Sequence, residues 1–481
     1  MKKWICFLLL LCLALSAVGC GNRGETPAEG SGASGEETTP PETEETYYLD
    51  TLAPNDFGEN VYRVMTIQGN IPNPKAYDGN DLVDQALLSR DIAMEDYYGI
   101  TFGYTSMENN NTAVADMQVA AMSQSGVPHA FITSAIRLMN LAANGYVANL
   151  NSVDNLDLDQ RWWNQSLNNN VMFRDALYCT AGPYSEYYYH SALCLAFNKT
   201  IAAAHEINGI YDLVLNDEWT LEKMREFCTE YDVTVDKGSD GMDESDTYSI
   251  SAFYGVMYGL YAGAGGKFST INDEGEIEVN LVTEESQAIL GDILKIFKKD
   301  VTTYYGDYKP SADIFTAGKA LFLYTSTGYI HDYLPGSSVD YGIIPTPKAD
   351  TAQENYITCA WPSSNYCVSV PYGHVGDAKA FAGLMLEAYC FLSYEHVRPV
   401  KYDSVLKYKV SIDPTASQIM DLLFETLYFD MNLVFDFGGS RTLIRTTIQN
   451  DSLDSFTSDV SKKASAISGD IEKFLTNGKL D

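Results

Sequence analysis

The side chains that could carry out catalysis are numerous, but their spacing matches no catalytic motif. The chain has 65 acidic residues and six histidines, at positions 129, 190, 205, 331, 374 and 396. A serine hydrolase needs a nucleophile beside a general base, and a glycosidase needs two carboxylates on rigid elements. No GxSxG or HExxH pattern is present, and among so many acids a carboxylate pair carries no information. The sequence therefore predicts no enzyme activity and no cofactor, with an exported glycoside hydrolase as the enzyme alternative.

An acidic loop (DKGSDGMDESD) is the candidate for a metal site. Its acids Asp236, Asp240 and Asp243 could supply oxygen ligands to Ca²⁺. An EF-hand loop needs an acid at its third position and a bidentate Glu at its twelfth, where this chain has Gly238 and Thr247. A solvated acidic loop is therefore the simpler interpretation, and a calcium loop is kept as the alternative.

Cysteine usage leaves two possibilities open. Cys6, Cys12 and Cys20 lie at the amino terminus. The other six are Cys179, Cys194, Cys228, Cys359, Cys367 and Cys390. Six cysteines can pair in many ways, and no CxxC or other metal-like spacing occurs, so both disulfides and buried free thiols are compatible with the sequence.

Aromatic rings are the chemistry that the sequence offers most plainly. The chain has 34 tyrosines, and four of them, at 184, 187, 188 and 189, gather just before the apolar run 193–198. A tyrosine ring combines a flat apolar face with a hydroxyl, which suits either an interface or a wet ligand cleft. Packing between two domains is the alternative for each of these rings. Tyr184 and Tyr187 are the preferred ligand candidates.

The elements that would position these residues alternate between strand and helix. The apolar run 62–67 predicts a strand, 83–97 a helix and 98–102 the start of the next strand. A helix from Ala113 and a short strand at 129–133 follow. Such alternation is typical of parallel α/β sheets, whose ligands bind at the carboxyl ends of the strands. Farther along, threonines at 220 and 283 have the pattern of helix N-caps.

The segment 313–348 combines the same signals. A short amphipathic helix stops at Gly318, the apolar run 320–324 has strand length, and the polar loop 325–328 follows. At 481 residues the chain is longer than one core allows, so two or more domains are expected. The segment 313–348 is predicted to form a helix, a buried strand and a polar loop.

The amino terminus has the features of an export signal. Lys2 and Lys3 precede an apolar run at 4–15 that is too short to be a typical membrane span. The following residues, Ala-Val-Gly-Cys, resemble the lipobox of bacterial lipoproteins, in which the cysteine, here Cys20, is diacylated and becomes the mature amino terminus. Loss of the two lysines changes the net charge from −34 to −36. So acidic a chain excludes nucleic acid as an expected partner, because phosphate binding depends on Lys and Arg.

Ordered short motifs resemble the family 1 extracellular solute-binding proteins. They include Gly318-Lys319-Ala320 before the strand in the segment 313–348, and Gly342-Ile343-Ile344-Pro345-Thr346-Pro347 after it. Earlier motifs are Tyr97-Tyr98-Gly99-Ile100, Gly126-Val127-Pro128-His129-Ala130 and Gly145-Tyr146-Val147-Ala148-Asn149-Leu150. His129 departs from the aspartate that the family usually has. The resemblance extends over about 62–475.

The resemblance implies an α/β, two-lobe periplasmic-binding-protein-like fold of type II, whose interleaved lobes are joined by three hinge crossings near 180–190, 308–314 and 360–368. It implies four parts. They are a lipoprotein signal peptide (1–19), a lipidated cysteine with a flexible acidic tether (20–57), an N-terminal lobe (58–184 and 314–362) and a C-terminal lobe (185–313 and 363–481).

The implied function is capture of a sugar or oligosaccharide for an ABC importer by hinge closure, at the extracytoplasmic face of the cell membrane. Alternatives are a binding protein for peptide or another small solute, and a sensor module without a transporter. Expected partners are the ligand, the permease subunits and the membrane, with the protein itself a monomer. The expected ligand residues are Tyr184, Tyr187, Tyr261, Ser326, Tyr329, Trp361, Asn365, Tyr366, Asp436 and Arg441. For Asp436 and Arg441 a surface ion pair is the alternative, and Ser326 and Tyr329 are expected to share one pocket with Tyr184 and Trp361.

Overall fold

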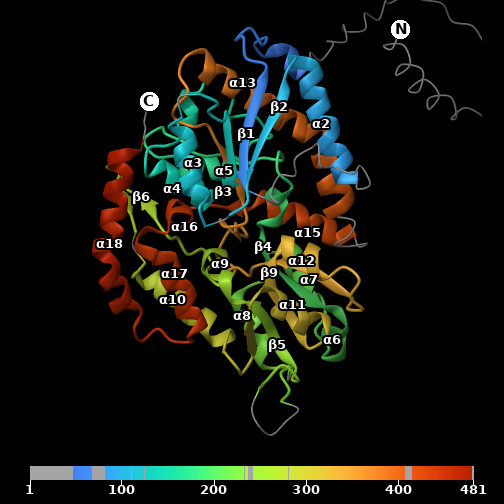
Figure 1. Cartoon of the computed structure of the whole chain (residues 1–481). Helices are drawn as coiled ribbons and strands as arrows, with labels where there is room; N and C mark the ends of the chain where they lie inside the picture. Colours follow the sequence, from blue (N-terminus) through green and yellow to red (C-terminus); the bar gives the residue numbers. More distant parts are fainter. Residues whose placement is uncertain are drawn as a thin grey trace, which may run out of the picture. The chain divides into compact units, whose positions relative to one another are not determined.

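Two β-sheets form the framework of the protein (Figure 1). The computed structural model describes residues 47–67, 82–109, 111–123, 125–231, 233–236, 242–279, 281–406 and 414–478. The predicted signal peptide, the candidate lipidation site Cys20 and most of the predicted tether therefore lie outside the described residues. We call the elements packed around the first sheet the first lobe and those packed around the second sheet the second lobe.

The first sheet has the strand order β12-β3-β1-β2. Its strands are β1 (Val61–Ile67), β2 (Thr101–Met107), β3 (Ala130–Ser134) and β12 (Tyr366–Ser369). β1 is parallel to both β2 and β3, whereas β12 is antiparallel to β3. Helix α2 (Leu82–Tyr98) connects β1 to β2, and α3 (Ala113–Ala121) connects β2 to β3. The predicted strand–helix alternation is thus confirmed over this part of the chain.

The second sheet has the strand order β10-β4-β9-β5-β8. Its strands are β4 (Leu193–Asn198), β5 (Tyr248–Phe253), β8 (Thr303–Gly306), β9 (Ala320–Ser326) and β10 (Tyr341–Pro345). β5 is parallel to both β8 and β9, so these three strands end at the same edge of the sheet. β4 is antiparallel to β9 and β10. Two small ladders, β6 (Thr270–Ile271) with β7 (Ile277–Glu278) and β11 (Thr358–Cys359) with β13 (Leu427–Tyr428), complete the strands.

The strand pairing differs from the lobe assignment expected for 314–362. We expected this segment in the first lobe, but β9 lies between β4 and β5, and β10 pairs with β4. All seven residues of β9 are buried, as expected of a strand in the middle of a covered sheet. The crossing expected near 308–314 falls inside helix α11 (Tyr308–Thr316), which connects two strands of the second sheet.

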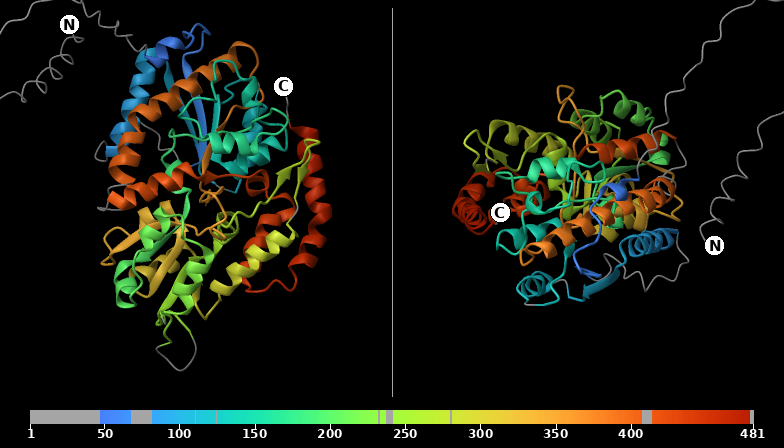
Figure 2. Two further views of the ribbon diagram at one scale, coloured as in Figure 1. Left: turned by 180° about the vertical axis from the view of Figure 1, so that it is seen from behind. Right: turned by 90° about the horizontal axis from the view of Figure 1, so that it is seen from above.

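The segment 363–481 is also divided between the lobes, although we expected it in the second. β12 belongs to the first sheet, and the long helix α13 (Asp377–His396) packs against α2. Figure 2 shows α13, in orange, beside the blue α2 from behind. After η6 (Pro399–Leu406), a π-helical segment, α15 (Pro414–Glu425) packs on β10 of the second sheet. The chain thus passes between the sheets before β4, after β10 and again after α13.

The remaining helices cover the two sheets. They are η1 (Tyr48–Thr51), α4 (Ala135–Ala142), η3 (Leu150–Ser152), α5 (Gln165–Val171), η4 (Glu186–His190), α6 (Lys199–Ala204), α7 (Ile210–Leu215), α8 (Leu221–Thr229), η5 (Tyr254–Val256), α9 (Tyr258–Gly263), α10 (Glu284–Ile296), α12 (Thr327–Tyr333), α16 (Met431–Phe435), η7 (Phe437–Gly439), α17 (Ser440–Gln449) and α18 (Phe456–Asn477). The predicted caps of α8 and α10 are confirmed, because the side chains of Thr220 and Thr283 accept hydrogen bonds from Lys223 N and Ser286 N. No helix among the described residues is long and apolar enough to cross a membrane.

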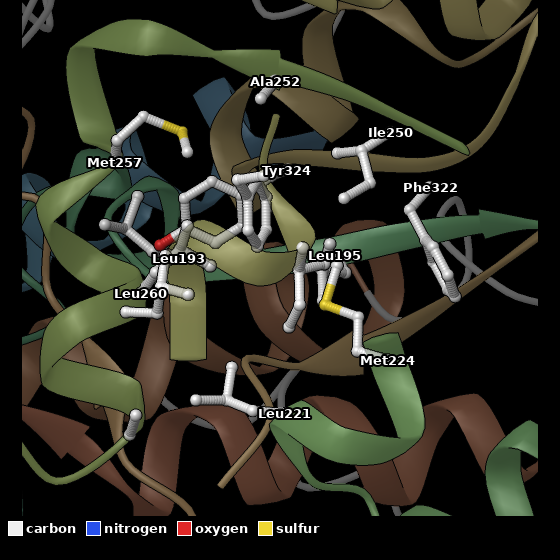
Figure 3. Packing of buried hydrophobic residues seen from close by; sticks show 14 of the residues in the cluster. Leu193, Leu195, Leu221, Met224, Ile250, Ala252, Met257, Leu260, Phe322 and Tyr324 are labelled. Atoms are coloured by element: carbon white, nitrogen blue, oxygen red, sulfur yellow. The ribbon is translucent and has the colours of Figure 1, made fainter. Parts of the chain in front are cut away.

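The second lobe has a continuous apolar core between its sheet and its helices. Figure 3 shows Tyr324 of β9 surrounded by Leu193, Met257 and Leu260, with Leu221 and Met224 of α8 below the sheet. Burial of such side chains contributes roughly 25 cal/mol for each Å² of apolar surface removed from water. Tyr324, which ends the apolar part of the predicted strand, is therefore a core residue.

The buried carboxylate of Glu387 links several segments of the first lobe by hydrogen bonds. Glu387 of α13 accepts hydrogen bonds from the indole Nε1 atoms of Trp162 (2.9 Å) and Trp163 (3.1 Å), from the Tyr48 hydroxyl (2.9 Å) and from the amide of Asp157 (3.1 Å). Residues from Tyr48 onward, which we expected to belong to the flexible tether, are therefore anchored to this lobe. Burial raises the pKa of Glu387 to about 7, despite these four donors.

Candidate functional site

Aromatic side chains gather at the edge of the second sheet where its parallel strands end. Phe253 is the last residue of β5, Tyr308 begins the helix after β8, and Tyr329 lies in the first turn of the helix after β9. Trp361 follows β11 and joins them, together with Tyr333 of α12. We call these five residues the aromatic cluster. Such an edge is where ligands bind in open α/β sheets.

The rings of the aromatic cluster contact one another closely. Tyr329 stacks on Tyr308 with ring centroids 4.7 Å apart and lies 5.3 Å from Trp361. Phe253 lies 5.6 Å from Tyr329 and 5.5 Å from Trp361. Tyr308 is 37 % exposed, and Tyr329 and Trp361 are partly exposed. The cluster therefore presents aromatic surface to solvent while its rings hold each other in place.

A second group of rings lies on the segments that connect the sheets. Tyr187 of η4 lies 5.2 Å from Tyr366, the first residue of β12, and 5.2 Å from His190. His190 in turn lies 5.5 Å from His331 of α12. The structure thus brings together Tyr187 and Tyr366, which are both expected ligand residues, and adds two histidines that the sequence did not single out.

The turn between Trp361 and Asn365 joins these two groups. The amide of Trp361 donates to Ser191 O at 2.7 Å, and Asn365 Nδ2 donates to Ser191 Oγ at 2.8 Å. The Asn365 carbonyl accepts from Ala135 N at 3.0 Å, at the start of α4 in the first lobe. Asn365 is fully buried, so its side chain positions Trp361 and leaves no surface for a ligand.

Tyr184 and Ser326 lie beneath the surface that the other candidates form. Tyr184 is fully buried in the core of the first lobe, and its hydroxyl donates to Thr180 O at 3.0 Å and Tyr366 O at 3.2 Å. Ser326 is buried as the N-cap of α12, where its Oγ accepts from Tyr329 N at 3.4 Å. The Tyr184 hydroxyl thus holds the backbone of Tyr366, and the Ser326 hydroxyl holds the backbone of Tyr329. We expected Ser326, Tyr329, Tyr184 and Trp361 to line one pocket. Of these four side chains, the rings of Tyr329 and Trp361 are the ones that meet at the surface.

Tyr261 lies elsewhere in the second lobe. It is 1 % exposed, and its hydroxyl is hydrogen-bonded to Lys267 O (3.1 Å) and Ser286 Oγ (2.7 Å). It borders a cavity of about 280 Å³ that none of the aromatic cluster lines. The structure does not bring Tyr261 to the other predicted ligand residues.

Asp436 and Arg441 are paired with each other. Arg441 Nη2 lies 3.2 Å from Asp436 Oδ2, and the Arg441 amide donates to Asp436 Oδ1 at 2.8 Å. Arg441 Nη1 also donates to Leu433 O at 2.7 Å. Both side chains are mostly buried, so the pair stabilises the turn between α16 and α17.

Metal ligands and disulfides are not found among the described residues. Asp240 lies outside them, and Asp243 uses its carboxylate to accept a hydrogen bond from Ser245 N at 2.6 Å. No group of His, Cys, Asp or Glu in the part of the chain that the structure describes could hold a metal ion. The six cysteines from Cys179 to Cys390 are buried free thiols in this structure.

Comparison with solved structures places the fold among substrate-binding proteins. A cyclic α-maltosyl-1,6-maltose binding protein from Arthrobacter globiformis matches with a TM-score of 0.59 at 12 % identity, over 86 % of this chain and 100 % of that chain. An ABC substrate-binding protein from Listeria monocytogenes in complex with cycloalternan matches with a TM-score of 0.52 at 13 % identity, over 86 % and 98 % of the two chains. UgpB from Mycobacterium tuberculosis in complex with glycerophosphocholine matches with a TM-score of 0.52 at 16 % identity, over 87 % and 99 %. These likenesses confirm the expected two-lobe α/β fold, while the hinge crossings near 180–190 and 360–368 stay a prediction.

Sequence comparison supports the same assignment at the level of the family. No curated protein is similar enough in sequence to be recognised as a relative. The family model for bacterial extracellular solute-binding proteins matches residues 91–389, which is more than half of the chain. The protein therefore belongs to the bacterial extracellular solute-binding proteins.

Proposed function

We propose that the protein captures a sugar or oligosaccharide outside the cell and delivers it to an ABC importer. The observation that carries this proposal is the aromatic cluster at the carboxyl ends of β5, β8 and β9, in which Tyr329 and Trp361 keep exposed ring surface. Aromatic faces stack on the apolar faces of sugar rings, and the tyrosine hydroxyls can bond to sugar hydroxyls.

The proposed mechanism is closure of the two lobes on the ligand. Tyr366 belongs to the first sheet, whereas Tyr329 follows a strand of the second, and the turn 361–365 joins their surroundings. A ligand that contacts both groups binds the closed arrangement more tightly than the open one, and this difference in affinity is what shifts the equilibrium. Permease subunits would then recognise the closed form.

The solved structures with a similar fold support a small polar ligand. One is described in complex with cycloalternan, one as a binding protein for cyclic α-maltosyl-1,6-maltose, and the third in complex with glycerophosphocholine. Binding of a peptide or another solute, and a sensing role without a transporter, stay as alternatives. A glycoside hydrolase is the remote alternative, and turnover of any glycoside would favour it.

We also propose that Cys20 carries the lipid that holds the protein at the extracytoplasmic face of the membrane. The lipobox-like sequence before Cys20 supports this, and the family is extracellular. Labelling of cells with a radioactive or clickable fatty acid should mark the wild-type protein and leave Cys20→Ser unlabelled. Equal labelling of both would remove the basis for the anchor.

The binding proposal is tested by a thermal-shift screen of the purified protein followed by calorimetry. The screen contains mono-, di- and oligosaccharides, glycerophosphodiesters, amino acids, peptides and polyamines. We expect stabilisation by a saccharide and a loss of at least tenfold in affinity in Trp361→Ala. Tyr372→Ala, which removes an exposed tyrosine outside the aromatic cluster, is the matched control and should bind normally. Stabilisation by peptides alone would contradict the sugar assignment.

A further inference from the structure

A cavity of about 460 Å³ lies beside η4, whose Tyr188 and Tyr189 line it. We call it the α15 pocket, because Asp421, Phe424 and Glu425 of that helix form one of its walls. Trp162 and Trp163 of the first-lobe core border it on one side, and Tyr189 and Tyr402 of a second-lobe cluster border it on the other. Its size is within the range of small-molecule sites, which is about 300–1,000 Å³.

The α15 pocket is separate from the candidate sugar site. Tyr187 of η4 contacts Tyr366 and His190 of the candidate sugar site, whereas the next two residues, Tyr188 and Tyr189, line the α15 pocket. None of the aromatic cluster lines the α15 pocket. An occupant of the pocket and a ligand at Trp361 would therefore contact different residues.

The floor of the pocket is aromatic. Tyr402 is stacked on Tyr189 with ring centroids 5.2 Å apart, and its edge meets the ring of Phe424 at 5.3 Å. Tyr188 lies 6.2 Å from Phe424. Rings locked together in this way offer a preformed apolar surface for a flat group.

One wall carries guanidinium groups. Arg161 and Arg398 lie over the ring of Tyr394, with their Cζ atoms 4.9 and 5.2 Å from its centroid. Arg161 lies 4.0 Å from the carboxylate of Glu395, and Arg398 lies 3.6 Å from the carboxylate of Asp403. These separations exceed hydrogen-bond length, and exposed pairs of this kind contribute little to stability, so the guanidinium donors can turn to an anionic group.

Carboxylates also line the pocket. Asp421 and Glu425 are one helical turn apart on α15, and Asp421 accepts a hydrogen bond from the Tyr402 hydroxyl at 2.9 Å. Glu425 is exposed. The pocket wall therefore carries both positively and negatively charged groups beside aromatic rings.

We propose that the α15 pocket is a second small-molecule site, which takes a zwitterion that bears a flat apolar group, such as an aromatic amino acid. The carboxylate of the ligand lies against Arg398 and Arg161, its ammonium lies against Glu425 and Asp421, and its ring lies on the partly exposed rings of Phe424 and Tyr188. The inference does not depend on the sugar-binding proposal.

Calorimetry of the purified protein with matched ligands tests the charge requirement. L-phenylalanine and L-tryptophan carry both charges, whereas phenethylamine has only the ammonium and 3-phenylpropionate only the carboxylate. We expect saturable binding of both amino acids and binding at least about tenfold weaker for each single-charge analogue, because each lacks one charge-assisted contact. No saturable binding of either amino acid up to its solubility limit would overturn the proposal, as would equal binding of the analogues.

Variants then locate the binding. Arg398→Gln and Glu425→Gln each remove one charged wall, and each should weaken L-tryptophan binding by about tenfold. Arg225→Gln, which changes an arginine on α8 away from the pocket, should leave it unchanged. Glu425 is exposed and its change should not affect folding, which circular dichroism and thermal melting of each variant would verify. Loss of L-tryptophan binding in Trp361→Ala, with normal binding in Glu425→Gln, would assign the amino acid to the candidate sugar site and contradict the α15 pocket.

Discussion

The ring of Trp361 lies 5.3 Å from the ring of Tyr329, although the two residues come from different connections between strands. Tyr329 is fixed by the first turn of α12, and Trp361 is fixed by the hydrogen bond from its amide to Ser191 O. We expect Tyr329→Ala and Trp361→Ala each to reduce ligand affinity by at least tenfold. Because the two rings support each other, the double variant should lose less than the sum of the two free-energy changes, with a coupling of about 0.5–1.5 kcal/mol. Calorimetry on the four proteins of this cycle measures it, and simple additivity would mean that the rings act independently.

Asn365 should affect binding without touching the ligand. Its buried side-chain amide donates to Ser191 Oγ and accepts from Cys367 Sγ, so removal of the amide leaves both of these buried groups without this partner. We expect Asn365→Ala to lower the free energy of unfolding by about 1–3 kcal/mol. Ligand affinity should fall as well, because the turn that holds Trp361 loosens. Urea denaturation and calorimetry check both effects, with the exposed Asn355→Ala as a control that should change neither.

Glu387 makes stability depend on pH in a defined direction. Burial raises its pKa from 4.5 to about 7, so between these values the folded protein binds more protons than the unfolded chain. The contribution of this group to stability is therefore complete below pH 4.5 and is lost as the pH rises through 7. Its full size is on the order of 3 kcal/mol.

Urea denaturation between pH 5 and pH 8 should show this contribution as a difference between wild type and Glu387→Gln. The variant lacks the titrating group, so its unfolding free energy should decline less toward pH 7. It should be less stable than the wild type overall, because the NH₂ group of its side-chain amide faces the indole N–H donors of Trp162 and Trp163. Glu395→Gln, an exposed change in the same helix, is the control and should follow the wild type. Parallel curves for wild type and Glu387→Gln would show that Glu387 does not titrate in this range.

The six described cysteines should be unreactive in the folded protein. All six are buried free thiols, and burial raises the pKa of Cys194, Cys228 and Cys359, so little thiolate forms near neutral pH. Iodoacetamide at pH 8 should label none of them in the native protein and all of them in urea without a reductant. Mass spectrometry distinguishes the outcomes, because a disulfide would leave two cysteines unlabelled in urea until a reductant is added.

Local features of the fold could be predicted from the sequence because each depends on neighbouring residues. The strand–helix alternation of β1, α2, β2, α3 and β3 follows from apolar periodicity, and the caps Thr220 and Thr283 follow from side-chain hydrogen bonds a few residues long. Sheet membership could not be predicted in this way. β9 has the composition of a buried strand wherever it is placed, and its pairing with β4 and β5 depends on segments far earlier in the chain.

The candidate site shows the same limit. Tyr329 and Trp361 could be proposed because each was expected in or beside a polar loop, and the structure brings these two together. Tyr184 has the same composition signal but is buried, since burial is decided by tertiary packing around it. Phe253 and Tyr308 were not predicted, although a signal existed: each stands at the end of a strand parallel to β9 or directly after it.

The hydrogen bond from Tyr48 to Glu387 determines where mechanical load enters the protein. Tyr48 lies almost at the start of the described chain, and its hydroxyl and ring contact Glu387, Trp162 and Phe391. A force applied to the amino-terminal end therefore acts first on this contact and passes into the twenty-residue helix α13, before it reaches β1. The first sheet is thus shielded from being peeled strand by strand when the protein is pulled from its amino terminus.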